Sequence, residues 1–173
     1  GDSALIEYAG GQPRIYHGPE HRVMTNDPPY DEQLLELKKW NFEEATRDTP
    51  LPGNVNPIDR FVRANYFLQT LRKPRSERAA IATVFSIARN ASVPFNAPYK
   101  TVGTIYDTEY RTVINLEARR YFFELTTSPN VIWVDLGKFD LSPEAAVMVL
   151  DPDDIELSGN VNRHFKRAAA QPF

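Results

Sequence analysis

The chain has 173 residues, of which 42% are hydrophobic and 25% are charged, and these are ordinary proportions for a folded globular protein. Its 20 Lys and Arg against 23 Asp and Glu give a net charge of −3, which offers no electrostatic footprint for nucleic-acid binding. The sequence has no apolar run of about 18 residues, the minimum for a membrane span, and no cysteine, so these residues form no disulfide, thiolate metal site or cysteine nucleophile.

The first segment, residues 3–26, predicts three short strands with turns at Gly10–Gly11 and at residues 18–20. The second turn belongs to the run from His17 to His21, HGPEH, which has the H-x-x-E-H spacing of a zinc site. That chemistry requires both histidines on one face of a helix, and the Gly-Pro pair is incompatible with a helix. We therefore expect a turn here and no metal.

Asn26 lies where the predicted third strand meets the turn-forming residues 27–29. An asparagine in such a place commonly stabilises the turn through its own side chain. The alternative is functional, because an amide NH2 group that projects from a strand end can stabilise a developing oxyanion. The local sequence leaves both interpretations open.

Three helices are predicted in the middle of the chain. Apolar residues at helical spacing indicate the first, over residues 31–41. Asn56 as N-cap and Pro57 at the first helical position indicate the second, which runs to about Leu71. The third begins near Ser76 and carries an apolar stripe on one face, formed by Ile81, Val84, Phe85 and Ala88.

Arg60 occupies the first turn of the second predicted helix, where the helix dipole disfavours a cation and Asp59 offsets it only in part. One interpretation is a solvated basic face shared with Arg63. The other is a guanidinium beside an amide-cleaving site, where it holds a carboxylate or stabilises the charge of an intermediate.

After Asn90 the pattern changes to strands, predicted over residues 101–106, 110–116, 120–126 and 131–134. The successive apolar residues 121–123 predict a strand that is buried on both faces. A short helix is expected over residues 161–168. Strands followed by helices and then by strands indicate an α+β fold with a layered core.

Four segments in order resemble one family: VMTNDPPYDEQL, LPGNVNPIDRFVRANYFLQTL, YDTEYRTVINLEARRYFFELT and NVIWVDL. Together, from about Asp2 to Leu136, they resemble the choloylglycine hydrolase and penicillin V acylase family of linear amide C–N hydrolases. The resemblance implies an N-terminal-nucleophile hydrolase fold, an αββα sandwich. It also implies cleavage of amides such as penicillin V, conjugated bile salts or acyl-homoserine lactones, without a cofactor, by a cysteine at the start of the mature chain.

The same resemblance gives Asn26 an oxyanion-hole role and Arg60 a role beside the nucleophile. It also implies that the cysteine's free α-amino group, with an ordinary pKa of about 8, acts as the general base. This sequence departs from the family at Gly1, which has no nucleophilic side chain, and it has no counterpart of the family's early arginine and aspartate. We therefore expect residues 1–173 to be the C-terminal portion of a single amidohydrolase domain, inactive without the N-terminal half.

The short interval between Asn26 and Arg60 resembles the Gram-negative branch of the family. This likeness implies substrates of the penicillin V or acyl-homoserine-lactone type and a periplasmic location, with the cytoplasm as the alternative. The expected partners are a small-molecule amide substrate and the N-terminal half of the same protein; a homo-oligomer stays open, and neither nucleic acid nor a membrane is expected. The alternative function is a non-catalytic binding or interaction domain, which the lack of cysteine favours.

Overall fold

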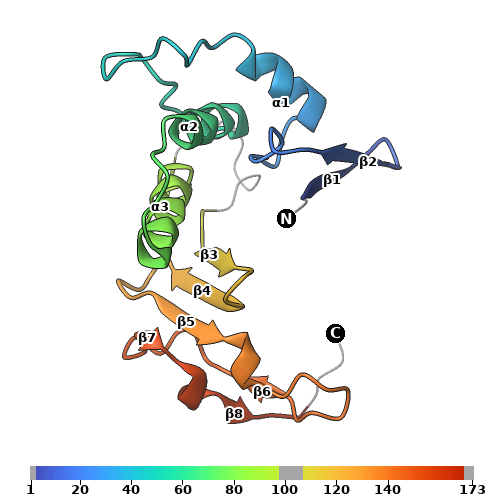
Figure 1. Cartoon of the computed structure of the whole chain (residues 1–173), viewed down its shortest axis with the longest axis vertical. Helices are drawn as coiled ribbons and strands as arrows, with labels where there is room; N and C mark the ends of the chain where they lie inside the picture. Colours follow the sequence, from blue (N-terminus) through green and yellow to red (C-terminus); the bar gives the residue numbers. More distant parts are fainter. Residues whose placement is uncertain (1–2, 98–106, 170–173) are drawn as a thin grey trace. The chain divides into compact units, whose positions relative to one another are not determined.

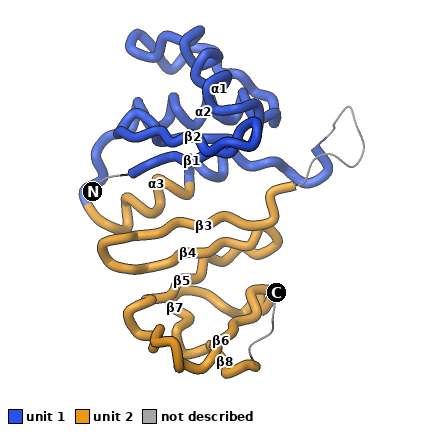
Figure 2. Tube along the Cα trace, turned by 90° about the vertical axis from the view of Figure 1, so that its right-hand side faces the viewer, with its two compact units in different colours: residues 1–75, 86–98 blue, residues 76–85, 99–173 orange. Residues whose placement is uncertain are grey.

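The computed structural model describes residues 3–97 and 107–169 (Figure 1). Its elements in chain order are β1 (Ala4–Ala9), β2 (Gln12–His17), α1 (Tyr30–Leu37), α2 (Pro57–Gln69), α3 (Glu77–Asn90), β3 (Tyr110–Asn115), β4 (Arg120–Leu125), β5 (Ile132–Asp135), η1 (Leu136–Lys138), β6 (Met148–Val149), β7 (Gly159–Asn160), η2 (Asn162–His164) and β8 (Lys166–Arg167). The chain divides into two compact units, shown in Figure 2. Unit 1 comprises residues 1–75 and 86–98, and unit 2 comprises residues 76–85 and 99–173.

Unit 1 contains the hairpin of β1 and β2 together with α1 and α2. The two strands pair antiparallel from Ala4 opposite His17 to Ala9 opposite Gln12. Gly10 and Gly11 form the turn with φ values of +59° and +75°, a region that glycine occupies without steric cost. Helices α1 and α2 contact each other, and their fully or nearly fully buried side chains include Tyr30, Gln33, Phe61 and Val62.

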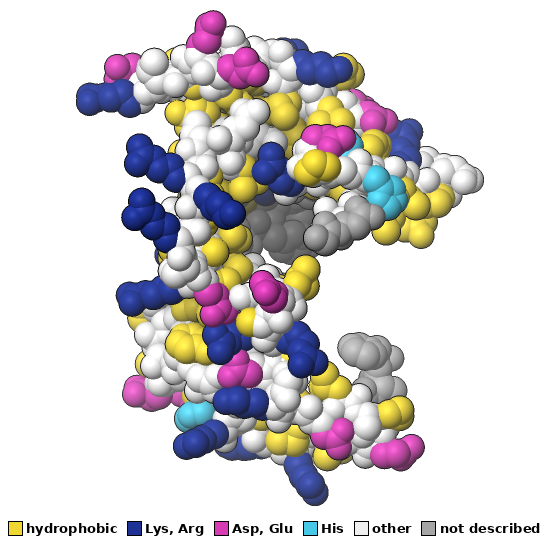
Figure 3. Space-filling view, viewed as in Figure 1, with side chains coloured by type: hydrophobic (Ala, Val, Ile, Leu, Met, Phe, Trp, Pro, Cys, Tyr) yellow, Lys and Arg dark blue, Asp and Glu magenta, His cyan; other side chains and the backbone are white. Residues whose placement is uncertain are grey.

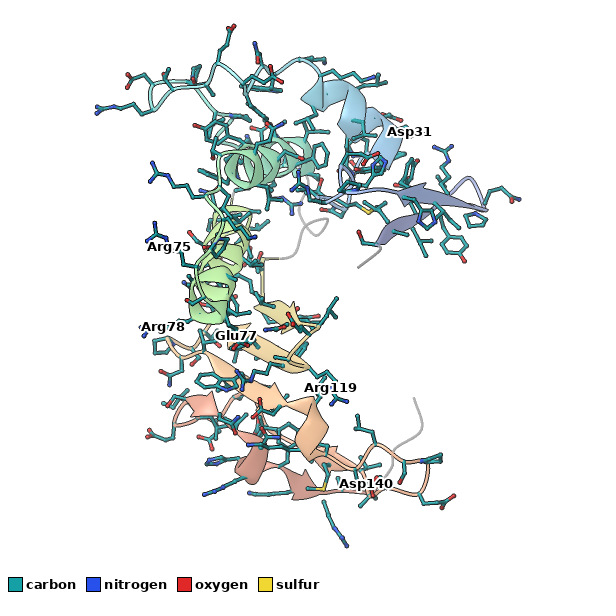
Figure 4. All side chains as sticks on the ribbon, in the orientation of Figure 1. Asp31, Arg75, Glu77, Arg78, Arg119 and Asp140 are labelled. Atoms are coloured by element: carbon teal, nitrogen blue, oxygen red, sulfur yellow. The ribbon has the colours of Figure 1, made fainter. Side chains whose placement is uncertain are left out.

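The hairpin has one face toward α1 and one exposed face. Arg14 and Tyr16 of β2 both hydrogen-bond Asp31, the α1 residue labelled in Figure 4. The opposite face carries Ile6, Tyr8 and Ile15, which are 58%, 78% and 57% exposed. Figure 3 shows hydrophobic side chains gathered on this hairpin.

The predictions for unit 1 are confirmed in part. The first two strands and their glycine turn are present, but the third is absent, because residues 21–25 form no strand. The Thr25 backbone instead hydrogen-bonds the Gln33 side chain: its N–H donates to Oε1 and its carbonyl accepts from Nε2. The helix predicted over residues 31–41 runs only from Tyr30 to Leu37, and the one from Asn56 is as expected but ends at Gln69.

Unit 2 is built on a four-stranded sheet in the order β3-β4-β5-β7. Strands β3, β4 and β5 pair antiparallel, and β7 lies parallel to β5. The buried core on this sheet consists of Ile132, Val134, Leu157 and Val161.

An ion-pair network joins the first residue of α3 to the middle of this sheet. Arg120 of β4 contacts Glu77 at 2.9 Å and Asp135 at 2.6 Å. Glu77 is labelled in Figure 4 at the start of α3. The Asp135 carboxylate also forms an ion pair with Lys138 at 3.3 Å and accepts a hydrogen bond from the Asn160 side-chain amide at 3.0 Å. One carboxylate therefore connects β5 with β4 and β7.

The predictions for unit 2 are confirmed for the strands near residues 110–116, 120–126 and 131–134; residues 101–106 lie outside the described residues. Residues 121–123 are half-buried, so burial on both faces is weaker than predicted. The helix expected over 161–168 is wrong: a single 3-10 turn, Asn162–His164, precedes the short strand β8. The turn is fixed because the Asn162 side chain bonds both backbone groups of Asp135.

None of the helices within residues 3–97 and 107–169 combines the length and the apolar character that a membrane span requires.

Candidate functional site

The two residues singled out in the sequence, Asn26 and Arg60, form a direct contact within unit 1. The Arg60 guanidinium donates from Nη2 to Asn26 Oδ1 at 2.5 Å, across 34 residues of sequence. Its Nε donates to the Val55 carbonyl at 2.9 Å. Asn26 is exposed and Arg60 is half-buried. The structure therefore brings the predicted pair together at the surface, with the guanidinium held at two points.

The start of α2 explains why Arg60 can reach this position. Asn56 Oδ1 accepts from the Asp59 backbone N–H at 2.8 Å, as predicted for the N-cap. The Asp59 carboxylate in turn accepts from the Asn54 N–H at 2.9 Å, which folds the preceding loop against the helix start. The negative charge of Asp59 and the Val55 carbonyl offset the unfavourable place of a cation at the positive helix end.

Arg63, one turn further along α2, has a structural role. Its Nη1 donates to the carbonyls of Pro52 and Asn54 at 2.8 and 2.7 Å, and its Nε donates to Asn90 Oδ1 at 3.1 Å. Only 9% of Arg63 is exposed, so the solvated basic face considered from the sequence is wrong for this residue. Burial lowers the pKa of its guanidinium, which still carries its charge. Arg63 thereby fixes the loop that supplies Val55.

Gln33 of α1 holds the loop that carries Asn26 through hydrogen bonds to its backbone. Gln33 is fully buried and bonds Thr25 on one side of Asn26 and Pro28 on the other. Gln33 is not among the residues predicted from the sequence. Its position was a usable signal, since Tyr30, Gln33, Leu34 and Leu37 share one face at helical spacing and a polar residue on that face must be buried with its partners.

The chemistry of the pair follows from the donor inventory of its two side chains. A guanidinium has no acceptor, so the atom of Asn26 that faces Arg60 is the carboxamide oxygen, and its NH2 group points the other way. In the described part of the chain, Asn26 Nδ2 has no recorded hydrogen-bond acceptor. A fixed neutral donor beside a cation suits an oxygen atom on which negative charge develops.

The HGPEH segment is a turn, as predicted, in which the His21 N–H donates to the Gly18 carbonyl at 3.2 Å. The His21 ring lies 3.1 Å from the Tyr30 hydroxyl through Nδ1, and burial raises the pKa of that tyrosine. Across residues 3–97 and 107–169 no three or more His, Cys, Asp or Glu side chains group as metal ligands. The His21 ring also packs against the rings of Tyr16 and Tyr30, so His21 contributes to the packing of the hairpin against α1.

Known proteins with similar sequences include an acylase and a hydrolase. Penicillin V acylase from Pectobacterium atrosepticum is 38% identical to this chain, with 100% of the chain and 49% of that protein covered. Conjugated bile acid hydrolase from Lactobacillus gasseri is 25% identical over 61% of the chain and 41% of its own length. The chain spans about half the length of the curated relatives that it matches.

Solved structures give the same result for the fold. Penicillin V acylase from Agrobacterium tumefaciens superposes with a TM-score of 0.85 and 40% identity, with 98% of this chain and 54% of that chain covered. A conjugated bile acid hydrolase from Clostridium perfringens, at 19% identity, superposes with a TM-score of 0.65 over 81% of this chain and 48% of its own. The predicted α+β fold of the N-terminal-nucleophile hydrolase type is confirmed.

A family model decides the assignment. The model described as linear amide C–N hydrolases, choloylglycine hydrolase family, matches residues 1–156, which is most of the chain. This span includes all of unit 1, unit 2 as far as residue 156, and the Asn26–Arg60 pair. The chain therefore belongs to the choloylglycine hydrolase family of linear amide C–N hydrolases.

Proposed function

We propose that the protein to which this chain belongs hydrolyses a linear amide C–N bond, and that Asn26 contributes its Nδ2 donor to the oxyanion hole. The observation that carries the proposal is the hydrogen bond from Arg60 to Asn26 Oδ1. It fixes the carboxamide with its NH2 group directed away from the guanidinium. Family membership and the penicillin V acylase relatives support the reaction class.

The nucleophile in this proposal is the thiol of a cysteine at the N-terminus of the mature protein, in a part that precedes residues 1–173. Its free α-amino group accepts the thiol proton, and the thiolate attacks the amide carbonyl carbon. The carbonyl oxygen becomes an oxyanion, to which Asn26 Nδ2 donates. Collapse expels the amine with the transferred proton, and water then hydrolyses the thioester to release the acid.

Arg60 has two tasks in this mechanism. It orients Asn26 through Nη2, and its charge stabilises the oxyanion without a proton transfer, because a guanidinium stays ionised at the pH of the reaction. The Val55 carbonyl holds the other edge of the guanidinium, so Arg60 cannot turn away from Asn26 without the loss of a second hydrogen bond.

We propose a substrate of the penicillin V type ahead of a conjugated bile salt. The two penicillin V acylases are 38% and 40% identical to the chain, whereas the two bile acid hydrolases are 25% and 19% identical. Acyl-homoserine lactones are the third substrate class, which the sequence resemblance implies.

The test is an acylase panel on the full-length protein, with the identity of its N-terminal residue verified by mass. We expect release of phenoxyacetate from penicillin V, and smaller or no release of glycine, taurine or homoserine lactone from the other substrates. Asn26→Ala should lower kcat by about 10²-fold, the usual loss for one oxyanion donor. Asn41→Ala, at an exposed asparagine outside the site, is the control.

Full-length protein that begins with cysteine yet releases no acid from any of these amides would overturn the proposal. It would favour the non-catalytic binding domain.

We also propose that the protein works in the periplasm. The support is the short interval between Asn26 and Arg60, which resembles exported members of the family. Fractionation of cells that produce the full-length protein tests this. Recovery with a cytoplasmic marker contradicts it.

A further inference from the structure

We propose that Gln33 is a positioning residue for the oxyanion donor, acting through Asn26. This inference rests on the proposed function of Asn26 and deepens it. Gln33 lies on α1 with none of its surface exposed, although its carboxamide is polar and α1 has only eight residues. A buried carboxamide persists when every polar atom has a partner, so its partners indicate what it does.

All partners of the Gln33 carboxamide lie on the loop that carries Asn26. Its Oε1 accepts from the Thr25 backbone N–H at 3.1 Å. Its two Nε2 hydrogens go to the carbonyls of Thr25 at 2.8 Å and Pro28 at 2.6 Å. Gln33 thus binds the backbone immediately before Asn26 and two residues after it.

Only a carboxamide satisfies this arrangement. The site offers two carbonyl acceptors and one N–H donor, which match the two donors and one acceptor of glutamine. A glutamate at this position would place a second acceptor against the Thr25 and Pro28 carbonyls and bury a negative charge. An apolar side chain would fill the space but leave both carbonyls without a donor.

Thr25 connects the same loop to α2. Its hydroxyl lies 3.0 Å from Gln33 Oε1 and 3.0 Å from the carbonyl of Pro57, the first residue of α2, and it donates its single proton to one of them. Arg60 follows three residues later on α2 and bonds Asn26. Gln33 therefore fixes the loop to α1 and Arg60 fixes it to α2, with the Thr25 hydroxyl within hydrogen-bond distance of both helices.

We expect these contacts to have one combined effect: they fix the position of the exposed Asn26 carboxamide. An oxyanion donor must lie within a few tenths of an ångström of its productive position, and a displacement of about 1 Å can cost about 10²-fold in rate. Gln33 restricts the loop backbone, and Arg60 restricts the side chain.

The experiment is a double-mutant cycle on the full-length protein, with penicillin V as the probe. Gln33→Glu should lower kcat about 10- to 100-fold and leave KM within about two-fold. The same substitution in an Asn26→Ala background should lower kcat by less than about two-fold, because the donor that Gln33 places is already gone. Gln69→Glu, at an exposed glutamine of α2, is the matched control and should have wild-type kcat.

A loss of equal size in both backgrounds would show that Gln33 supports the fold in general, and the inference would be wrong. If Gln33→Glu does not fold, as judged by its circular dichroism spectrum, Thr25→Val carries the test. It should lower kcat only when Asn26 is present, and Thr25→Ser should restore it. Wild-type kcat in Thr25→Val would then contradict the inference.

The outcome for the wild type separates the two proposals. Wild-type protein that cleaves no substrate overturns the proposed function and this inference together. Wild-type protein that is active and loses turnover in Asn26→Ala, but shows independent effects of Gln33 and Asn26, overturns this inference alone.

Discussion

At the scale of single residues, Asn26 and Arg60 depend on each other. Each side chain alone has a common structural explanation, a turn asparagine and a surface arginine. Their hydrogen bond defines the geometry of the pair, because an exposed carboxamide is held in one orientation by a cation from a helix 34 residues further along the chain. Arg63, on the same helix, differs only in its surroundings, and there the guanidinium binds backbone carbonyls and closes a loop.

Substitution of Arg60 tests this dependence. Arg60→Lys retains the charge but has one nitrogen in place of a planar fork, so it cannot bond Val55 and Asn26 together. We expect kcat to fall about 10-fold in Arg60→Lys and about 10²-fold in Arg60→Ala, with little change in thermal stability. Arg72→Lys, at an exposed loop position, is the control for the substitution itself. Wild-type kcat in Arg60→Lys would mean that charge alone matters.

At the scale of elements, the first turn of α2 positions Arg60 in the candidate site. The capping asparagine Asn56, the loop before it and the guanidinium of Arg60 form one hydrogen-bonded group around the helix start. This part follows from the sequence, since the cap, the proline at the first position and the acidic residue are all local signals.

Removal of the cap should therefore weaken the helix. Asn56→Ala leaves the Asp59 N–H without its acceptor and should lower the free energy of unfolding by about 1 kcal/mol. Asn56→Asp restores an acceptor and should recover most of it. Urea denaturation followed by circular dichroism measures both. An equal loss in the two variants would assign the effect to something other than the cap.

In the sheet of unit 2, Asp135 makes stability depend on pH. The hydrogen bond from Arg120, with Lys138 nearby, holds the pKa of the Asp135 carboxyl below its usual value of about 4. The folded value is the lower one, so the carboxylate stabilises the fold above about pH 4, and this contribution is lost as pH falls through the folded pKa. Asp135→Asn should lower stability at pH 7 and should make the loss of stability below pH 4 less steep.

The readout is the urea midpoint from pH 3 to 7, followed by tryptophan fluorescence, to which Trp133 on the same strand contributes. Asp153→Asn, at an exposed aspartate, should keep the wild-type profile. A wild-type profile in Asp135→Asn would contradict the assignment.

At the scale of the whole molecule, the main feature is an apolar surface on the hairpin of β1 and β2, which no other described residue covers. Ile6 and Ile15 lie directly opposite each other on the exposed face of the hairpin, and Tyr8 is beside them. A contiguous apolar face is unusual for a protein surface. We expect residues 1–173 prepared alone to bind a hydrophobic dye and to self-associate.

Threonine at both isoleucine positions tests this, since threonine keeps the preference for a strand. Ile6→Thr with Ile15→Thr should lower dye fluorescence and shift the sedimentation profile toward monomer. Leu141→Thr, at a single exposed leucine elsewhere, should change both much less. Unchanged dye binding in the double variant would contradict a role for the hairpin.

The parts of the fold that could be predicted from the sequence are those fixed by local signals: the hairpin turn, the Asn56 cap and the strands of unit 2 that are rich in β-branched and aromatic residues. The failures share one physical reason. Residues 21–25 and 161–168 have the composition of a strand and a helix, but each is held by hydrogen bonds between a side chain and the backbone of a distant residue. Gln33 bonds the backbone of Thr25, and the Asn162 side chain bonds the backbone of Asp135. Only the two residues that the family resemblance implies were predicted from the sequence. The polarity of Gln33 alone indicates a surface residue, and only its place on the apolar face of α1 indicates that it is buried.

Residues 38–51, between the end of α1 and the loop that Arg63 binds, make none of the contacts that hold Asn26. Asn26 is anchored by α1 and by the start of α2, and the exposed turn at Arg47 and Asp48 takes no part in that anchorage. Lengthening such a loop costs only about 0.6 kcal/mol per doubling. We therefore expect that a flexible peptide inserted between Arg47 and Asp48 leaves the proposed activity unchanged, so that this turn offers a place to attach a reporter or a surface tether.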